Sequence, residues 1–147
     1  MSRRDEVLVS TEWVAAHTGD AAYRLVGVDE DTAAYAGGHI PNAIAWHWKD
    51  DLHAAPRRDF LDQEGLSALL ARSGVGPDTT VVLYGGNNNW FATYAYWLLR
   101  YQGFDRVRLM DGGRKKWELE DRELVTEVPT PAAADPGPLA PVREEYR

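Results

Sequence analysis

Apolar residues fall in short blocks along the chain, and the blocks alternate between two kinds of spacing. One kind is a compact run of mostly apolar, often β-branched residues bounded by polar or turn-forming residues, which predicts a strand. Residues 80–84 are apolar almost throughout, as expected of a central parallel strand that is covered on both faces. Further short strands are predicted over residues 7–9, 24–28, 42–46 and 106–110.

The blocks between these strands carry the signals of helices. Helices are predicted over residues 11–17, 63–72 and 90–102, and a last helix ends at about Trp117. The first two follow a serine and an aspartate, which are favoured N-cap residues. Strands and helices therefore alternate along the chain. This order predicts an α/β fold, with an open, mostly parallel sheet and helices on both faces.

Composition and charge narrow the possible classes of protein. The 147 residues are 44% hydrophobic and include six Trp, seven Tyr and three Phe, enough apolar surface for one folded domain. The net charge of −7 argues against nucleic acid or an anionic membrane surface as a partner. The longest apolar-rich run, residues 90–99, is shorter than the roughly 20 residues that a membrane span needs. The first residues carry no apolar signal segment, so we expect a cytoplasmic location.

The chain contains no cysteine. Within these residues there is therefore no disulfide, no thiolate metal site and no cysteine nucleophile. A function that depends on sulfur chemistry would have to take its sulfur from another molecule or another domain.

The composition changes near the C-terminus. Five of the eight prolines fall between Pro129 and Pro141. A segment so rich in proline forms neither a helix nor a central strand, and it predicts an extended, semi-rigid linker. We therefore expect one domain over residues 1–128, folded from about Val7, and a linker with the start of a missing second domain over residues 129–147. The alternative is a frayed terminus of the kind that most domains have.

Ligands of open parallel sheets bind beyond the carboxyl ends of the strands. Three predicted strand ends carry candidate residues, at positions 29–31, 85–89 and 111–113. In the loop 85–89, two glycines permit close approach of the backbone, and N–H groups at the start of the next helix can hold a small anion. The loop contains no nucleophile, so covalent catalysis has no candidate there. The alternative is a tight turn without a ligand.

Metal sites are weaker candidates. The carboxylates at 29–31 are of the kind that binds Mg²⁺, but the central strand ends in Tyr84 and Gly85 rather than in a further acid. A second polar group lacks the helical i, i+4 histidine pair typical of zinc sites and comprises His47, Asp50, Asp51 and His53. We therefore predict neither a metal nor a cofactor.

Several short motifs occur in an order that resembles the rhodanese (thiosulfate sulfurtransferase) superfamily. The family stretch D…Y..GHIPGA is matched from Asp29 to Ala43, with Asn42 in place of the usual glycine. A hydrophobic strand then leads into the loop at Gly85, and the family's closing GG…W pattern follows. The resemblance covers about residues 7–128 and implies a rhodanese-like fold. The structural motif residues that it implies are Asp29, Gly38, His39, Gly112, Gly113 and Trp117.

The resemblance also implies that the catalytic cysteine of the family is missing from this chain. In active members, the residue after the central strand is the cysteine that carries the persulfide, and Gly85 holds that place here. The chain is therefore similar to the N-terminal, non-catalytic domain of bacterial tandem sulfurtransferases, and we expect no catalytic residue in it. The degenerate active-site loop comprises Gly85, Gly86, Asn87, Asn88, Asn89 and Trp90.

The reaction implied for the parent protein is transfer of a sulfane sulfur from thiosulfate to a thiophilic acceptor such as cyanide. The expected partner is a C-terminal rhodanese domain that supplies the cysteine, with a small anion as a possible ligand. Thiosulfate and 3-mercaptopyruvate remain alternative donors, because specificity lies in the cysteine loop. The rival hypothesis is a stand-alone inactive rhodanese-like domain that senses anions or binds another protein.

Overall fold

The computed structural model describes residues 8–20, 22–29, 33–47, 53–54, 59–60, 62–85 and 90–142. Within them, five strands form one sheet in the order β1-β7-β6-β2-β3, and every neighbouring pair is parallel. The predicted parallel α/β sheet is thereby confirmed. Its strands are β1 (Leu8–Val9), β2 (Tyr23–Asp29), β3 (Ile44–His47), β6 (Thr80–Tyr84) and β7 (Val107–Met110).

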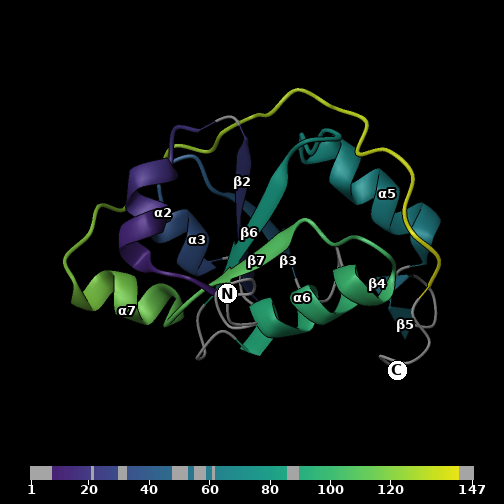
Figure 1. Ribbon diagram of the computed structural model, residues 1–147. Coiled ribbons are helices and arrows are strands. Elements are labelled where there is room, and N and C mark those ends of the chain that lie inside the picture. The colour runs from purple at the N-terminus through teal and green to yellow at the C-terminus, as the bar shows by residue number, and fades with distance from the viewer. Residues whose placement is uncertain are drawn as a thin grey trace.

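Helices cover both faces of the sheet (Figure 1). On one face lie α2 (Thr11–His17), α3 (Ala33–Gly37) and α7 (Gly113–Leu119), and on the other lie α5 (Gln63–Arg72) and α6 (Trp90–Tyr101). Two further short strands, β4 (His53–Ala54) and β5 (Asp59–Phe60), pair with each other in antiparallel fashion.

Helices α2 and α5 begin where the sequence predicts, because polar side chains satisfy N–H groups of their first turns. The Ser10 hydroxyl accepts a hydrogen bond from the Trp13 amide at 2.9 Å, and the Asp62 carboxylate accepts one from the Gly65 amide at 2.8 Å. The central strand β6 is buried on both faces, and it separates two apolar clusters. One cluster contains the α5 and α6 side chains, and the other contains Trp117 of α7.

The proline-rich segment lies along the surface of the domain and passes α5 before the chain ends (Figure 1). We name residues 129–142 the C-terminal strap. They contain no helix or strand, as the prolines predict, and backbone and side-chain groups hold them in place. The Ala134 amide donates to the Ala71 carbonyl at 2.9 Å, and the Ala140 amide donates to the Gly103 carbonyl at 3.1 Å.

Arg106 joins the strap to the sheet. Its guanidinium donates hydrogen bonds to the carbonyl oxygens of Thr79 at 3.0 Å, Gly76 at 3.2 Å and Pro136 at 3.1 Å. The same group lies over the Phe104 ring, 4.8 Å from its centroid. The strap is therefore part of the packed structure up to its last described residues.

Candidate functional site

The candidate site is the carboxyl edge of the sheet, where β6 ends and α6 begins. Of the predicted degenerate loop, the structure describes the two ends, Gly85 and Trp90, whereas residues 86–89 lie outside the described part of the chain. Gly85 is buried, and its carbonyl oxygen accepts a hydrogen bond from the Arg114 amide at 2.9 Å. Trp90 is 56% exposed at the first position of α6, and its ring meets that of Phe91 edge-on.

The Gly112–Gly113 turn brings the end of β7 against the end of β6. Gly112 has φ 85° and Gly113 has φ 62°, which are left-handed conformations that favour glycine. A Cβ atom at Gly112 would lie 2.4 Å from Cδ of Lys116, so the turn also has no room for a side chain there. The turn delivers the Arg114 amide to the Gly85 carbonyl. The residue that follows the predicted strand end 111–113 is thus bonded directly to the first residue of the predicted loop 85–89.

The third predicted strand end lies at Asp29, the last residue of β2. Its backbone pairs in register with His47 of β3, but its side chain lies outside the described part of the structure, as do Glu30 and Asp31. Of the candidate zinc group, Asp50 and Asp51 lie outside it as well. Among the described residues, no group of three or more His, Cys, Asp and Glu side chains could hold a metal ion.

His39 is fully buried beneath the turn that connects α3 to β3. Its Nδ1 lies 3.0 Å from the Tyr35 carbonyl oxygen, and its Nε2 lies 2.6 Å from that of Glu127. Its backbone exchanges two hydrogen bonds with Val125, at 2.8 and 2.7 Å. The Tyr35 ring stacks on the imidazole with 3.8 Å between centroids. These contacts support a structural role for His39, because both ring nitrogens face backbone carbonyls inside the protein.

Tyr35 and Gly38 complete the same turn. The Tyr35 hydroxyl donates to the Ala43 carbonyl at 2.6 Å, and burial raises the pKa of this phenol. The Gly38 amide donates to the Tyr35 carbonyl at 3.1 Å. Asn42, which replaces the usual glycine of the motif, adopts φ 68° and donates from its side chain to the Thr18 carbonyl. An asparagine tolerates this left-handed conformation better than most residues, which explains how the turn survives the replacement.

Trp117 fixes α7 against the sheet. Its ring is buried, and its Nε1 donates to the Glu123 carbonyl at 2.8 Å. Arg114, one turn earlier in α7, has a side chain that is only 14% exposed and lies 3.5 Å from the Glu118 carboxylate. Sequence reasoning assigned Arg114 no role in the site. It missed the contact of the Arg114 amide with Gly85, which the glycine pair before it could have indicated.

The order of these motifs is that of a known family, and the rhodanese-like domain family matches residues 10–120. The chain belongs to the rhodanese-like domain family. The rhodanese-like domain also has close relatives among curated proteins. One, from Saccharopolyspora erythraea, bears the name "Putative thiosulfate sulfurtransferase" and is 55% identical over 130 residues, which are 88% of this chain and 46% of that protein.

A second relative is the sulfur carrier protein TtuD of Thermus thermophilus. It is 50% identical over 125 residues, which are 85% of this chain and 44% of that protein. The rhodanese-like domain thus spans about half the length of these curated relatives. Among solved structures, a 3-mercaptopyruvate sulfotransferase from Escherichia coli superposes with a TM-score of 0.78 at 21% identity, over 94% of this chain and 56% of that one. This likeness shows the shared fold.

The site of this rhodanese-like domain therefore consists of hydrogen-bonded backbone without a thiol. The Gly112–Gly113 turn places the Arg114 amide against the Gly85 carbonyl, while the sequence offers no cysteine. No helix in the described residues is long and apolar enough to cross a membrane.

Proposed function

We propose that this chain is the non-catalytic N-terminal domain of a two-domain thiosulfate sulfurtransferase. The observation that carries the proposal is Gly85, which directly follows β6, at the place where the family resemblance puts the persulfide cysteine. The absence of cysteine from all 147 residues supports it. So does the length of the relatives, of which this chain spans about half.

The proposed reaction of the whole protein needs a thiolate. A cysteine thiolate attacks the sulfane sulfur of thiosulfate, the S–S bond breaks, and sulfite leaves with the bonding electron pair. The resulting persulfide gives its outer sulfur to cyanide, which forms thiocyanate and regenerates the thiolate. The present chain has no cysteine, so it cannot supply the thiolate that attacks thiosulfate. In the proposed protein, the second domain supplies this thiolate.

In the proposed protein, this domain forms one wall of the cleft that holds the active site. The backbone at Gly85 is held by the Arg114 amide, and the indole of Trp90 stands 56% exposed at the same edge. Tryptophan is enriched at the cores of interfaces relative to the rest of a protein surface, so an exposed Trp90 at this edge favours a surface that another domain covers. We propose that the second domain docks at this edge and that residues 129–147 connect the two. A cytoplasmic location is proposed with it.

The strap supports the part of the proposal that concerns the linker. Hydrogen bonds at Ala134, Pro136 and Ala140 fix its path on the domain surface. A linker fixed in this way reduces the conformational freedom that docking of the next domain must remove. The second domain would then begin from a defined point near α6 rather than from a flexible tether.

Two observations test the proposal: the reading frame that encodes the chain, and an assay of thiocyanate formation by the purified chain. The frame is expected to continue past codon 147 into a second rhodanese-like stretch that carries a cysteine after its own central strand. The purified chain is expected to form no thiocyanate from thiosulfate and cyanide above background. A natural stop near Arg147 would instead favour the stand-alone module that senses anions or binds another protein.

A further inference from the structure

The strap passes two positions at which helices end in a left-handed glycine. Gly74 follows α5 with φ 77°, and Gly103 follows α6 with φ 93°. In both cases the amides of the glycine and of the next residue donate back to carbonyl oxygens of the helix, as is usual where such a glycine ends a helix. Two helices on the same face of the sheet therefore end in backbone without a side chain.

The strap occupies the space that a side chain would need at each of these glycines. A Cβ atom at Gly74 would lie 2.7 Å from Cβ of Pro131 and 3.2 Å from the carbonyl oxygen of Ala132. At Gly103, a Cβ atom would lie 2.0 Å from the carbonyl oxygen of Ala140. The two glycines thus end their helices and also admit the strap.

Gln63, the first residue of α5, holds the strap beside the second glycine. Its Nε2 donates to the carbonyl oxygens of Gln102 at 2.8 Å and of Ala140 at 2.6 Å. A side-chain amide nitrogen carries two hydrogens, so both bonds form at once. The Ala140 amide donates to Gly103, and both backbone groups of Ala140 are therefore bound to the domain. We name Gly74, Gly103 and Gln63 the strap seat.

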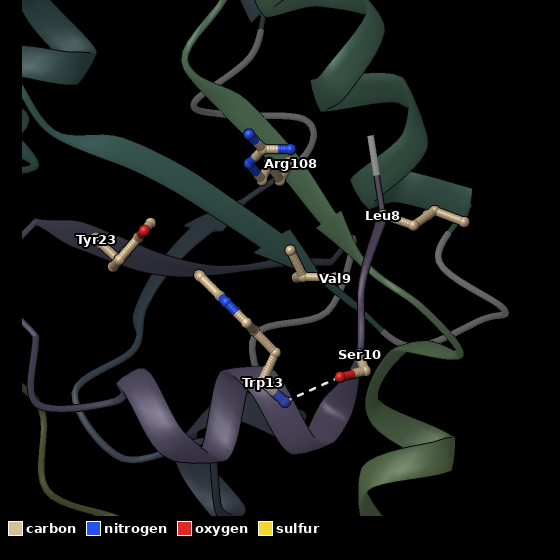
Figure 2. A pocket seen from close by; sticks show the side chains of 6 residues that line it. All are labelled: Leu8, Val9, Ser10, Trp13, Tyr23 and Arg108. Carbon is tan, nitrogen blue, oxygen red and sulfur yellow. Dashed lines mark hydrogen bonds between the residues drawn. The ribbon is translucent and has the colours of Figure 1, made fainter. Parts of the chain in front are cut away.

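The strap seat differs from the cavity on the face that α2 covers (Figure 2). That cavity, of about 340 Å³, opens between α2 and the strands β1, β2 and β7, and side chains form its walls. The rings of Trp13 and Tyr23 already meet edge-on there, with 4.8 Å between centroids. The strap seat consists of backbone atoms and one glutamine, so a shift of the strap backbone would break its hydrogen bonds.

Ala140 is the last residue in the described part of the strap that a hydrogen bond ties to the domain. The next such tie upstream is at Pro136, whose carbonyl oxygen accepts from Arg106. Release of Ala140 would therefore add residues 137–140 to the free part of the chain. A longer free connector lowers the effective concentration of a tethered domain at its docking surface.

We propose that the strap seat positions the second domain by fixing the point at which the chain leaves this one. That point lies at the C-terminal end of α6, a helix of 12 residues and about 18 Å in length whose other end is Trp90, beside Gly85. Gln63 and Gly103 are positioning residues, because they act through the strap. The inference rests on the proposed function for the identity of the second domain.

The first test measures the path of the strap in the 147-residue chain. The chain contains no cysteine, so Ala16→Cys in α2 and Pro141→Cys create two unique sites for spin labels, both at exposed positions. Double electron–electron resonance then gives the distribution of distances between the labels. We expect one narrow distribution. Gly103→Ala should widen it roughly twofold, because the new Cβ would meet the Ala140 carbonyl oxygen and free the strap beyond Pro136.

Gly137→Ala is the matched control, since Gly137 also has a left-handed φ of 84° but a Cβ there meets nothing within 4 Å. It should leave the distribution narrow. A broad distribution without either alanine, or no greater effect of Gly103→Ala than of Gly137→Ala, would overturn the inference. If Gly103→Ala does not fold, Gln63→Ala decides. It should speed amide exchange of Ala140 about fivefold and leave that of Ala134 unchanged, and equal rates before and after the substitution would also overturn the inference.

The second test uses the complete two-domain protein and an assay of thiocyanate formation. Gly103→Ala should raise the KM for thiosulfate roughly threefold and leave kcat within about twofold, because bound substrate favours a docked arrangement that the loosened strap populates less. Gly137→Ala should change neither value. A domain that is only destabilised would lose active fraction, and hence kcat, without a rise in KM.

Unchanged KM for Gly103→Ala in a complete protein that turns over would overturn the positioning role. No turnover by the unaltered complete protein would overturn the proposed function and the positioning role with it. The label distances in the chain alone would still show whether the strap is seated, so the two failures are distinguishable.

Discussion

Nε2 of His39 lies 2.6 Å from the carbonyl oxygen of Glu127, a residue 88 positions further along the chain. This contact ties the turn between α3 and β3 to the segment that follows α7. The backbone of His39 pairs with Val125 beside it, so the imidazole and the main chain hold the same two segments together. The most characteristic motif of the domain therefore acts by fixing the chain that leads into the strap.

Replacing His39 tests this role. His39→Ala should lower the free energy of unfolding by roughly 2 kcal/mol or more, because it removes a fully buried side chain together with the hydrogen bond that a ring N–H donates to a backbone carbonyl. Urea titration followed by tryptophan fluorescence measures the loss. Glu127→Ala is the matched control, since the imidazole contacts the backbone carbonyl of Glu127 and its exposed side chain is dispensable. Equal destabilisation by both variants would contradict the role assigned to the imidazole.

The strap should loosen when Arg106 is replaced. Arg106→Gln removes donors from three carbonyl oxygens, one of which belongs to Pro136. We expect faster hydrogen exchange at the amides of Ala134 and Ala140, together with about 1–3 kcal/mol lower stability. Amide exchange measured by NMR reports the strap residue by residue. Unchanged protection of both amides would show that the strap does not depend on Arg106.

The glycine turn next to Gly85 should not accept a side chain. Gly112→Ala should destabilise the domain by about 1–2 kcal/mol, because a left-handed φ of 85° disfavours alanine and the new Cβ would meet Lys116. Gly37→Ala is the control, since a Cβ at Gly37 meets nothing within 4 Å. Thermal unfolding of the two variants measures the difference. An equally stable Gly112→Ala chain would mean that the turn relaxes without cost.

The domain should lose stability in acid partly through Glu120. Hydrogen bonds from the Thr11 hydroxyl and from Arg122 lower the pKa of this carboxyl below its ordinary value of 4.5. A carboxyl whose pKa is lower in the folded state stabilises the fold above that ordinary value, and the contribution disappears as the pH falls through the folded pKa.

Glu120→Gln should therefore reduce the melting temperature at pH 7 more than at pH 3. Thermal scans of both chains across this range measure the difference between them. A difference that stayed constant with pH would contradict the assignment. A difference that grew toward acid would contradict it as well, because the sign of the linkage would be reversed.

Much of the fold could be predicted from local signals. Helix α2 begins after Ser10 and ends at His17 as predicted, and β6 covers the predicted residues 80–84, because caps and unbroken apolar runs are encoded within a few residues. The five-residue helix α3 and the two-residue strands β4 and β5 were not predicted. Elements so short carry too few turns or alternations for a pattern to emerge.

The contacts of the site were harder to predict. The bond between Arg114 and Gly85, and the packing of the strap through Arg106, join residues that are distant in the sequence. No periodicity marks such pairs, since they depend on how the layers assemble. The expected anion cradle in the loop 85–89 remains a prediction, because residues 86–89 lie outside the described part of the structure.

The central claim is that the thiol missing at Gly85 is supplied by a second domain of the same protein. The product of the complete reading frame is incubated with thiosulfate, digested and analysed by mass spectrometry, with the 147-residue chain treated in parallel. We predict the added mass of one sulfur atom on a cysteine encoded after codon 147, and no added sulfur on the chain alone. Thiocyanate formation by the chain alone, with contaminating enzyme excluded, or a complete product that takes up no sulfur, would contradict the claim.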